Sequence, residues 1–270
     1  MKTREKIPAS VNVLGLSTVH MKGREDAEEI RRLLSLCGIR VISMPGGGSN
    51  WEDIMDAPSA SLNIVVRDEL GLSLAKQMER DFGTPYMSSG LPYGTDGTMS
   101  WLSEIIEKLG AGELTRASHE VAKLKEFLLR KGNNLESLWG PLWFDAVLIS
   151  APPSEALGIA ETIRSEWIDT ARLVIHAQCV TEKTTPAADA IRVVMKNEKE
   201  IAKDYEDWQG GLVLSSSHET HLLRRMGRSF TGFHIALPSH NEVHFSDLPQ
   251  CGLRGAGYLY EQLWNAKLRK

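Results

Sequence analysis

Short apolar runs alternate with segments of helical periodicity along the first hundred residues. Runs typical of buried parallel strands occupy 11–15, 39–44, 62–66 and 84–87. Apolar residues recur at steps of three and four over 22–37 and 70–82, and a short helix is predicted after 97. This strand and helix order predicts a parallel sheet with right-handed crossovers and helices on both faces.

The same pattern starts again near Phe144. Further strands are predicted at 144–150, 171–177, 190–195, 211–214 and 233–237, and further helices at 156–167, 218–226 and 254–268. We therefore predict an α/β protein with two Rossmann-like, doubly wound parallel-sheet domains over 9–112 and 143–270. The segment 113–142 is predicted to link the two domains, with a helix first and a loop at 131–141 after it. We expect the strand ends of the two domains to face a shared cleft.

Composition and charge narrow the classes of function. The chain has 270 residues, of which 42% are hydrophobic and 24% charged, so it can bury a large core. The formal net charge of −4 gives no electrostatic footprint for nucleic acid, and we expect neither nucleic acid nor membrane partners. The polar opening Met1–Ser10 and the absence of an apolar run of about 18 residues predict a cytoplasmic protein.

Candidate ligand-binding residues lie in the loops that follow the predicted strands. In open parallel sheets, helix N-termini and free backbone amides converge beyond the carboxyl ends of the strands. The predicted cofactor-binding residues are His20, Gly46, Gly47, Gly48, Arg67, His176, Cys179, Ser216, His218 and Glu219.

Three of these segments have a second interpretation. Gly46–Ser49 offers amides to an anion, but it is equally a flexible turn, because it lacks the spacing of dinucleotide or P-loop motifs. An NAD-type dehydrogenase is disfavoured, because Gly15–Gly23 after the first predicted strand lacks the dinucleotide fingerprint. Ser215–Glu219 suits either a polar ligand or helix N-capping. Arg67 and Asp68 follow a buried strand, where they face a ligand or form an internal salt bridge.

The histidines and cysteines give weaker indications of chemistry. The pairs His218/His221 and His240/His244 lack the HExxH pattern, so metal binding and a solvated or capping role both stay open. No GxSxG motif supports a hydrolase nucleophile. Cys37, Cys179 and Cys251 are far apart in sequence, as expected of reduced thiols.

Several segments, in this order and spacing, resemble the nitrogenase component 1 type oxidoreductases. In the first half they are Asn12–Gly15, Glu29–Ile30, Leu33–Leu34, Cys37–Ile39, Ser61–Val65, Met78–Glu79 and Phe82–Tyr86. In the second half they are Gly211–Glu219, Leu222–Gly227, Ile235–Pro238, Gly252–Ala256, Glu261 and Asn265. The resemblance extends over nearly the whole chain.

The resemblance implies Rossmann-like domains, related subunits that pair with one another, iron-sulfur clusters and electron transfer from an ATP-dependent iron-sulfur reductase. The family includes nitrogenase subunits, cofactor-assembly scaffolds and tetrapyrrole reductases. Its chains usually begin with a domain that carries cluster-binding cysteines, whereas only ten residues precede Val11 here. The chain thus resembles the later part of such a subunit, either as a piece of it or as a reduced homologue.

Nitrogenase activity itself is not expected. Nitrogenase α subunits carry a cofactor cysteine after the strand that corresponds to Leu62–Val66, and this chain has Arg67 and Asp68 there. Cys179 is the cysteine best placed to face a cleft and to bind a metal, with a buried spectator thiol as the alternative.

Our leading hypothesis is an oxidoreductase subunit that binds a metal cluster or tetrapyrrole-like ligand between its domains. It would receive electrons from the reductase and pair with a homologous subunit or a second copy. The alternative is a non-catalytic binding or scaffold protein that kept the fold without cluster ligands.

Overall fold

The computed structural model describes residues 4–177, 191–195 and 198–269, which form two compact units. The first unit takes in the chain up to Arg130 together with Asp247–Gly257, and the second takes in Lys131–Ser246 and Tyr258–Lys270. The division falls inside the helices α5 (Thr115–Trp139) and α9 (Gly252–Leu268). Each unit therefore combines segments that are distant in sequence.

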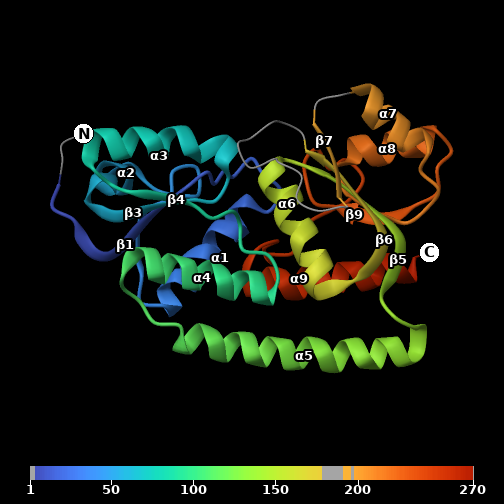
Figure 1. Cartoon of the computed structure of the whole chain (residues 1–270), viewed down its shortest axis with the longest axis horizontal. Coiled ribbons are helices and arrows are strands. Elements are labelled where there is room, and N and C mark those ends of the chain that lie inside the picture. The colour runs from blue at the N-terminus through green and yellow to red at the C-terminus, as the bar shows by residue number, and fades with distance from the viewer. Residues whose placement is uncertain (1–3, 178–190, 196–197, 270) are drawn as a thin grey trace. The chain divides into compact units, whose positions relative to one another are not determined.

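The first unit contains a four-stranded parallel sheet with the order β2-β1-β3-β4. Its strands are β1 (Ile7–Leu14), β2 (Arg40–Ser43), β3 (Ala60–Val65) and β4 (Tyr86–Ser88). Its helices are α1 (Gly23–Leu36), α2 (Trp51–Asp56), the 3-10 turn η1 (Ala57–Ser59), α3 (Asp68–Phe82) and α4 (Thr95–Leu109). Figure 1 shows α2 and α3 on one face of this sheet and α1 and α4 on the other.

Apolar packing and a set of hydrogen-bonded polar side chains stabilise the first sheet. Both faces of the sheet are covered by helices, so most residues of its central strands β1 and β3 are buried. Leu14 and Val65 are fully buried and pack with residues of α3. Within the sheet, the Asn12 side chain donates to Asn63 Oδ1 at 2.8 Å and accepts from Ser43 Oγ at 2.7 Å. These buried polar groups are thus mutually satisfied across three strands.

The second unit contains a five-stranded parallel sheet with the order β7-β6-β5-β8-β9. Its strands are β5 (Trp143–Ala151), β6 (Asp169–Ala177), β7 (Ile191–Met195), β8 (Leu212–Ser215) and β9 (Thr231–His234). Its helices are α6 (Pro153–Thr162), which continues as the π-helical turn η2 (Ile163–Trp167), α7 (Glu198–Glu206) and α8 (Ser217–Arg225). In Figure 1, α7 and α8 lie on one side of the sheet and α6 on the other.

The predicted fold class is confirmed: both units are parallel α/β sheets wound in two directions from a central strand. The domain boundaries and the shared cleft stay predictions. Within the described residues, no helix combines the length and apolar character that a bilayer crossing requires.

The predicted loop over 131–141 is wrong, because α5 is helical as far as Trp139. Gly132 and two asparagines lower the helix propensity there, but Val121, Leu128 and Leu135 continue one apolar stripe at seven-residue steps. A side chain at Gly132 would meet the Tyr260 hydroxyl at 2.5 Å, so glycine permits that close packing.

Two short helices were absent from the sequence prediction. Helix α2 begins after Asn50, whose side chain accepts from the Asp53 N–H at 2.8 Å in a capping box. Helix α7 lies in the connection between β7 and β8, which are separated in the sheet by β6 and β5, and a connection between parallel strands of one sheet must cross over it. Strand β9 also ends at His234 rather than Leu237.

Candidate functional site

The loops at the carboxyl edge of the first sheet pack against one another. The Thr18 N–H donates to the Gly46 carbonyl at 3.0 Å, and the Gly47 N–H donates to the Met44 carbonyl at 2.8 Å. Gly46 has φ +77°, and a Cβ there would lie 2.3 Å from the Leu16 carbonyl oxygen. The close approach of two backbones therefore accounts for Gly46, and the amide of Gly47 is already engaged within the loop.

Arg67 follows β3 inside the first unit and is fully buried. Its guanidinium donates to the Gly15 carbonyl at 3.4 Å and lies 3.9 Å from Asp26 Oδ2. Asp26 Oδ1 in turn accepts from the N–H groups of Gln250 and Cys251 at 2.7 and 3.0 Å. Of the two interpretations of Arg67, the internal salt bridge is the one that the structure contains.

His20 occupies a turn near this edge and is partly exposed. Its carbonyl accepts from the Gly23 N–H at 3.0 Å, and a Cβ on Gly23 would lie 2.0 Å from the Ser17 carbonyl oxygen. The turn that carries His20 is therefore fixed by tight backbone packing immediately before α1.

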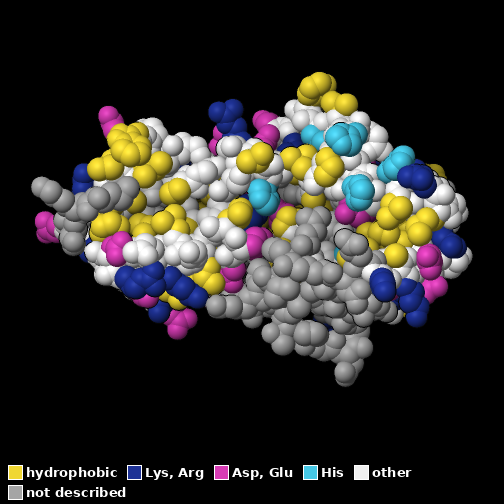
Figure 2. All heavy atoms as spheres, turned by 90° about the horizontal axis from the view of Figure 1, so that it is seen from above, with side chains coloured by type: hydrophobic (Ala, Val, Ile, Leu, Met, Phe, Trp, Pro, Cys, Tyr) yellow, Lys and Arg dark blue, Asp and Glu magenta, His cyan; other side chains and the backbone are white. Residues whose placement is uncertain are grey.

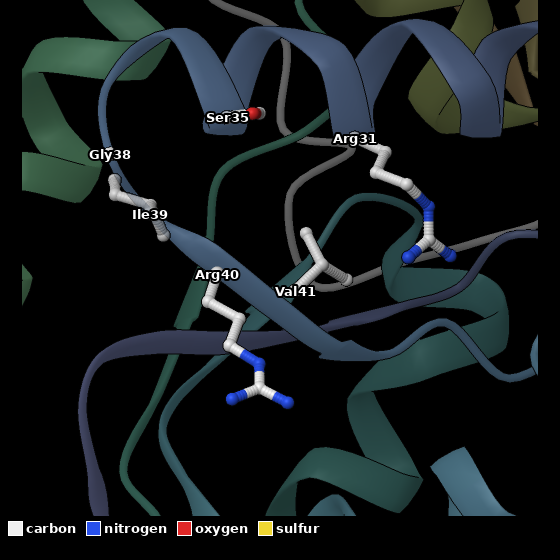
Figure 3. A pocket seen from close by; sticks show the side chains of 6 residues that line it. All are labelled: Arg31, Ser35, Gly38, Ile39, Arg40 and Val41. Carbon is white, nitrogen blue, oxygen red and sulfur yellow. The ribbon is translucent and has the colours of Figure 1, made fainter.

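A pocket of about 390 Å³ in the first unit lies away from the carboxyl edge. Figure 3 shows its lining from the end of α1 and the start of β2, where Arg31 and Arg40 project as two separate side chains. Ligands of open parallel sheets bind beyond the carboxyl ends of the strands. This pocket lies at the beginning of β2, at the opposite edge, so it is not the expected ligand site.

The second sheet presents a different carboxyl edge. Strand β5 is central, and the chain continues from it to β6 on one side and later to β8 on the other. Such a change of direction marks the usual ligand position in doubly wound sheets. Ser150 of β5 pairs in register with His176 of β6. On the other side, Ile149 of β5 pairs with Leu214 of β8, and the residues that follow this pair are Ser150 and Ser215. Two hydroxyls and an imidazole thus lie at the ends of adjacent strands.

His176 at the end of β6 is held by a buried carboxylate. Its Nε2 lies 3.0 Å from Asp204 Oδ2, and the two residues are only 1% and 2% exposed. The Arg172 guanidinium lies 3.9 Å from the other Asp204 oxygen. A carboxylate in this position orients the imidazole, and an oriented histidine is the side chain most often used for general acid–base chemistry.

Tyr205 of α7 lies next to this pair. Its ring centroid is 5.3 Å from that of His176, and the ring belongs to a buried apolar cluster that also contains Trp208. Burial raises the pKa of the Tyr205 hydroxyl, and the charge of Glu219 raises it further, while a hydrogen bond with Ser150 acts in the opposite direction. The hydroxyl therefore stays protonated at neutral pH and serves as a hydrogen-bond donor.

Ser216 and Glu219 begin helix α8 as a capping box. The Ser216 hydroxyl accepts from the His218 N–H at 3.1 Å, and Glu219 accepts from the Ser216 N–H at 3.1 Å. Capping therefore accounts for both residues locally. Ser216 is buried, whereas the His218 side chain is exposed. Figure 2 shows histidine side chains at the surface on the side of the picture that holds α8.

The described cysteines do not suit an iron-sulfur cluster. Cys37 and Cys251 are free and buried, and burial raises the pKa of both thiols. Iron-sulfur clusters are held by several cysteine thiolates together, and these two residues do not belong to any group of three possible metal ligands among the described residues. The group of possible metal ligands found among the described residues contains no cysteine. Cys179, the predicted metal ligand, lies outside the described residues.

Sequence reasoning missed Asp204 and Tyr205, which complete the edge of the second sheet. Both lie on α7, in a segment to which the sequence pattern had assigned no helix or strand. The apolar residues Ile201, Tyr205 and Trp208 recur at steps of four and three, so the periodicity was available as a signal. The ion pair between Asp26 and Arg67 left no such signal, because acidic residues are common in the first turn of a helix.

The fold and this edge define a doubly wound α/β protein with a polar site beyond its strand ends. The family model for nitrogenase component 1 type oxidoreductases matches residues 1–268. The chain belongs to the nitrogenase component 1 type oxidoreductase family. Members of this family bind metal clusters and work with an ATP-dependent reductase component.

Two curated relatives illustrate the similarity, and both are B-type chains of the light-independent protochlorophyllide reductase. The chain from Chlorobium phaeobacteroides (strain BS1) is 25% identical over 276 residues, which cover 95% of this chain and 51% of the relative. The chain from Synechococcus sp. (strain CC9311) is 27% identical over 260 residues, 93% of this chain and 48% of the relative. The protein described here therefore spans about half the length of these relatives.

Solved structures confirm the fold. The structure titled "Nitrogenase Cp1 at pH 6.5" aligns with a TM-score of 0.71 and 17% identity, covering 99% of this chain and 62% of that chain. A second, "Nitrogenase Cp1 at pH 5", aligns with a TM-score of 0.67 and 18% identity, covering 99% and 58%.

Proposed function

We propose that this chain is part of a reductase that acts on a conjugated ring compound of the tetrapyrrole class, with electrons delivered by an ATP-dependent iron-sulfur reductase. The observation that carries the proposal is the family match over residues 1–268 together with the protochlorophyllide reductase relatives. A homologous subunit or a second copy of this chain would complete the assembly, in which any cluster would be held by residues other than Cys37 and Cys251.

The carboxyl edge of the second sheet is the proposed ligand-binding region. Reduction of a ring double bond consumes two electrons and two protons, so the enzyme must supply protons as well as electrons. His176, oriented by Asp204, is the proposed proton donor. The Tyr205 hydroxyl and Ser216 would supply hydrogen bonds to polar groups of the ligand.

The other sequence-derived candidates take lesser roles in this proposal. His218, in the first turn of α8, would contact carboxylate or carbonyl groups at the periphery of the ligand, while Glu219 would hold the start of the helix through its capping contacts with Ser216. The loops of His20 and Gly46–Gly48 would line the corresponding edge of the first sheet, while Arg67 fixes the backbone there. Cys179 stays a proposed metal ligand, to be tested by substitution.

A non-catalytic binding or scaffold protein is the second candidate, and one observation favours it. Within the described part of the chain, the possible metal ligands form a group without cysteine, and the cysteines present are buried. A protein with this site could bind the ring compound without reducing it.

A binding and reduction experiment distinguishes these functions. The chain is purified without oxygen, and protochlorophyllide is titrated in while the pigment's absorption bands are followed. Reduction is then measured after addition of the reductase and component 1 partner proteins from the same source. The variants are His176→Gln and, as a matched control, His221→Gln, since His221 is exposed on α8.

We expect the wild-type chain to bind the pigment and support its reduction. His176→Gln should lower the reduction rate by about 10²–10⁴-fold while pigment binding changes little, because general acid catalysis contributes about that much. His221→Gln should behave as wild type. Binding without reduction would establish the scaffold function instead, and absence of binding would contradict both.

A further inference from the structure

A second group of polar side chains lies beyond β9 and plays no part in the proposed function. His234 is the last residue of β9, and Glu242 and His244 come from the loop that follows. One nitrogen from each histidine and one carboxylate oxygen all lie within 4.8 Å of one another. We propose that His234, Glu242 and His244 form a binding site for a divalent transition-metal ion of the zinc type.

The distances between the three ligands suit a metal after a small contraction. Glu242 Oε2 lies 3.8 Å from His234 Nδ1 and 3.8 Å from His244 Nε2. In a tetrahedral zinc site with bonds of about 2.0–2.1 Å, ligand atoms are about 3.3 Å apart. The two Glu242 distances therefore need to close by roughly half an ångström, and the distance between the histidine nitrogens, which is within 4.8 Å, by at most about 1.5 Å. Rotation of the Glu242 and His244 side chains in the loop would bring the ligands together.

Neighbouring groups already orient the ligands. His234 Nε2 lies 3.3 Å from the Thr220 hydroxyl oxygen of α8, which can accept a hydrogen bond from Nε2–H and so leave Nδ1 with its lone pair for a metal. Glu242 accepts from the backbone N–H of His234 at 3.0 Å. Metal-bound histidines typically have such a hydrogen-bond partner on the other ring nitrogen.

The loop is attached to α8 at its start, and its two ligand residues are partly buried. The Pro238 carbonyl accepts from the N–H and the hydroxyl of Ser217 at 2.7 and 2.8 Å, which attaches the loop to α8. Glu242 and His244 are partly buried, while Phe245 is 97% exposed. Glu242 and His244 both approach His234, because their ligand atoms and a nitrogen of His234 lie within 4.8 Å of one another.

The donor set indicates the class of metal. Two imidazole nitrogens and one carboxylate are the three protein ligands of many zinc centres that keep a fourth, open position. The Ser239 hydroxyl lies 2.8 Å from His234 Nδ1 and 3.2 Å from His244 Nε2, next to that position. On metal binding, this hydroxyl becomes the fourth ligand or gives way to water. Without a metal, the same serine joins the two rings by hydrogen bonds.

Metal titration of the tag-free chain tests the proposal, which does not depend on the proposed function. Zn²⁺ is titrated against a competing chelator, and Co²⁺ is titrated while the absorption spectrum is recorded. Both titrations use the Cys179→Ser variant to remove the thiol outside the described residues. The ligand variants are Glu242→Gln and His244→Gln, and the matched control is His240→Gln, because His240 is exposed in the same loop.

We expect one tightly bound Zn²⁺ per chain and a Co²⁺ spectrum without thiolate charge-transfer bands. Glu242→Gln and His244→Gln should each weaken Zn²⁺ binding by roughly tenfold or more, and Zn²⁺ should raise the melting temperature of the control but not of these variants. Ser239→Ala should still bind one Zn²⁺ per chain, because the three protein ligands are unchanged. No stoichiometric binding, or unchanged affinity in both ligand variants, would overturn the proposal.

Discussion

The carboxyl edges of the two sheets occupy the same place in their units but contain different chemistry. At the first edge, glycine loops pack backbone against backbone, and the Arg67 charge is compensated inside the protein by Asp26. At the second edge, Ser150 and His176 are the last residues but one of β5 and β6, and Ser215 is the last residue of β8. Their hydroxyl and imidazole groups can form hydrogen bonds with a ligand.

This difference shows how much of a site is decided by fold and how much by side chains. The sheet order predicts a ligand site equally well at both carboxyl edges, because each sheet has a central strand from which the chain continues in two directions. At the first edge, the polar groups form hydrogen bonds and an ion pair with one another inside the protein. At the second edge, polar side chains lie at adjacent strand ends. Fold alone would therefore have assigned the same role to both.

Removal of Asp26 should give the largest effect on stability. Asp26→Ala leaves the buried Arg67 without its carboxylate and two backbone N–H groups without their acceptor, so we expect a loss of about 3–5 kcal/mol in the free energy of unfolding. Asp56→Ala, in the exposed ion pair with Arg4, should cost no more than about 1 kcal/mol. Urea unfolding measures both.

An additional variant separates the two functions of Asp26. Asp26→Asn keeps an oxygen that can accept from the Gln250 and Cys251 N–H groups but loses the charge that faces Arg67. We expect its stability to lie between those of wild type and Asp26→Ala. A value for Asp26→Ala within about 1 kcal/mol of wild type would show that the pair is not a structural element of the first edge.

Alanine substitutions in the glycine loop should give the next largest effects and should differ from each other. Gly46→Ala and Gly48→Ala both place a side chain at positive φ, which costs about 1–3 kcal/mol. Gly46→Ala adds a clash with the Leu16 carbonyl, whereas no atom lies within 4 Å of a Cβ on Gly48. Thermal unfolding should therefore rank Gly46→Ala as the less stable. Equal melting temperatures would mean that the loops do not pack as described.

Loss of the Tyr205 hydroxyl should give the smallest effect. Tyr205→Phe removes the hydrogen bond with Ser150 and keeps the ring in its apolar cluster, so we expect a loss of about 0.5–1.5 kcal/mol. Ser150→Ala and the double variant complete a mutant cycle by urea unfolding. Additive losses would show that the two hydroxyls do not interact.

The sequence allowed the fold to be predicted where periodicity was strong. The strand ending at Leu14 and the helix after Lys22 were recognised because buried parallel strands are continuously apolar and helices repeat every three or four residues. The extension of α5 to Trp139 was missed, since glycine and asparagine outweighed a continuing apolar stripe in that prediction.

The candidate site was predictable only in part, because its members come from separate segments. His176 lies near the end of an apolar strand and Ser216 directly follows another, so strand-end reasoning selected both. Asp204 and Glu242 approach histidines only after the chain has folded, and neither lies in a recognisable motif. Arg67 and His176 also looked alike in sequence, and only their partners distinguish a structural group from a chemical one.

The contacts of Asp26 with Gln250 and Cys251 also constrain how the protein is made. They join positions 224 and 225 residues apart, and the Gly252 N–H similarly donates to the Pro92 carbonyl. During synthesis the first unit must therefore wait until Gln250 and Cys251 have left the ribosome before its buried charges find their final partners. A nascent chain stalled before residue 250 would expose that unfinished surface to chaperones and proteases.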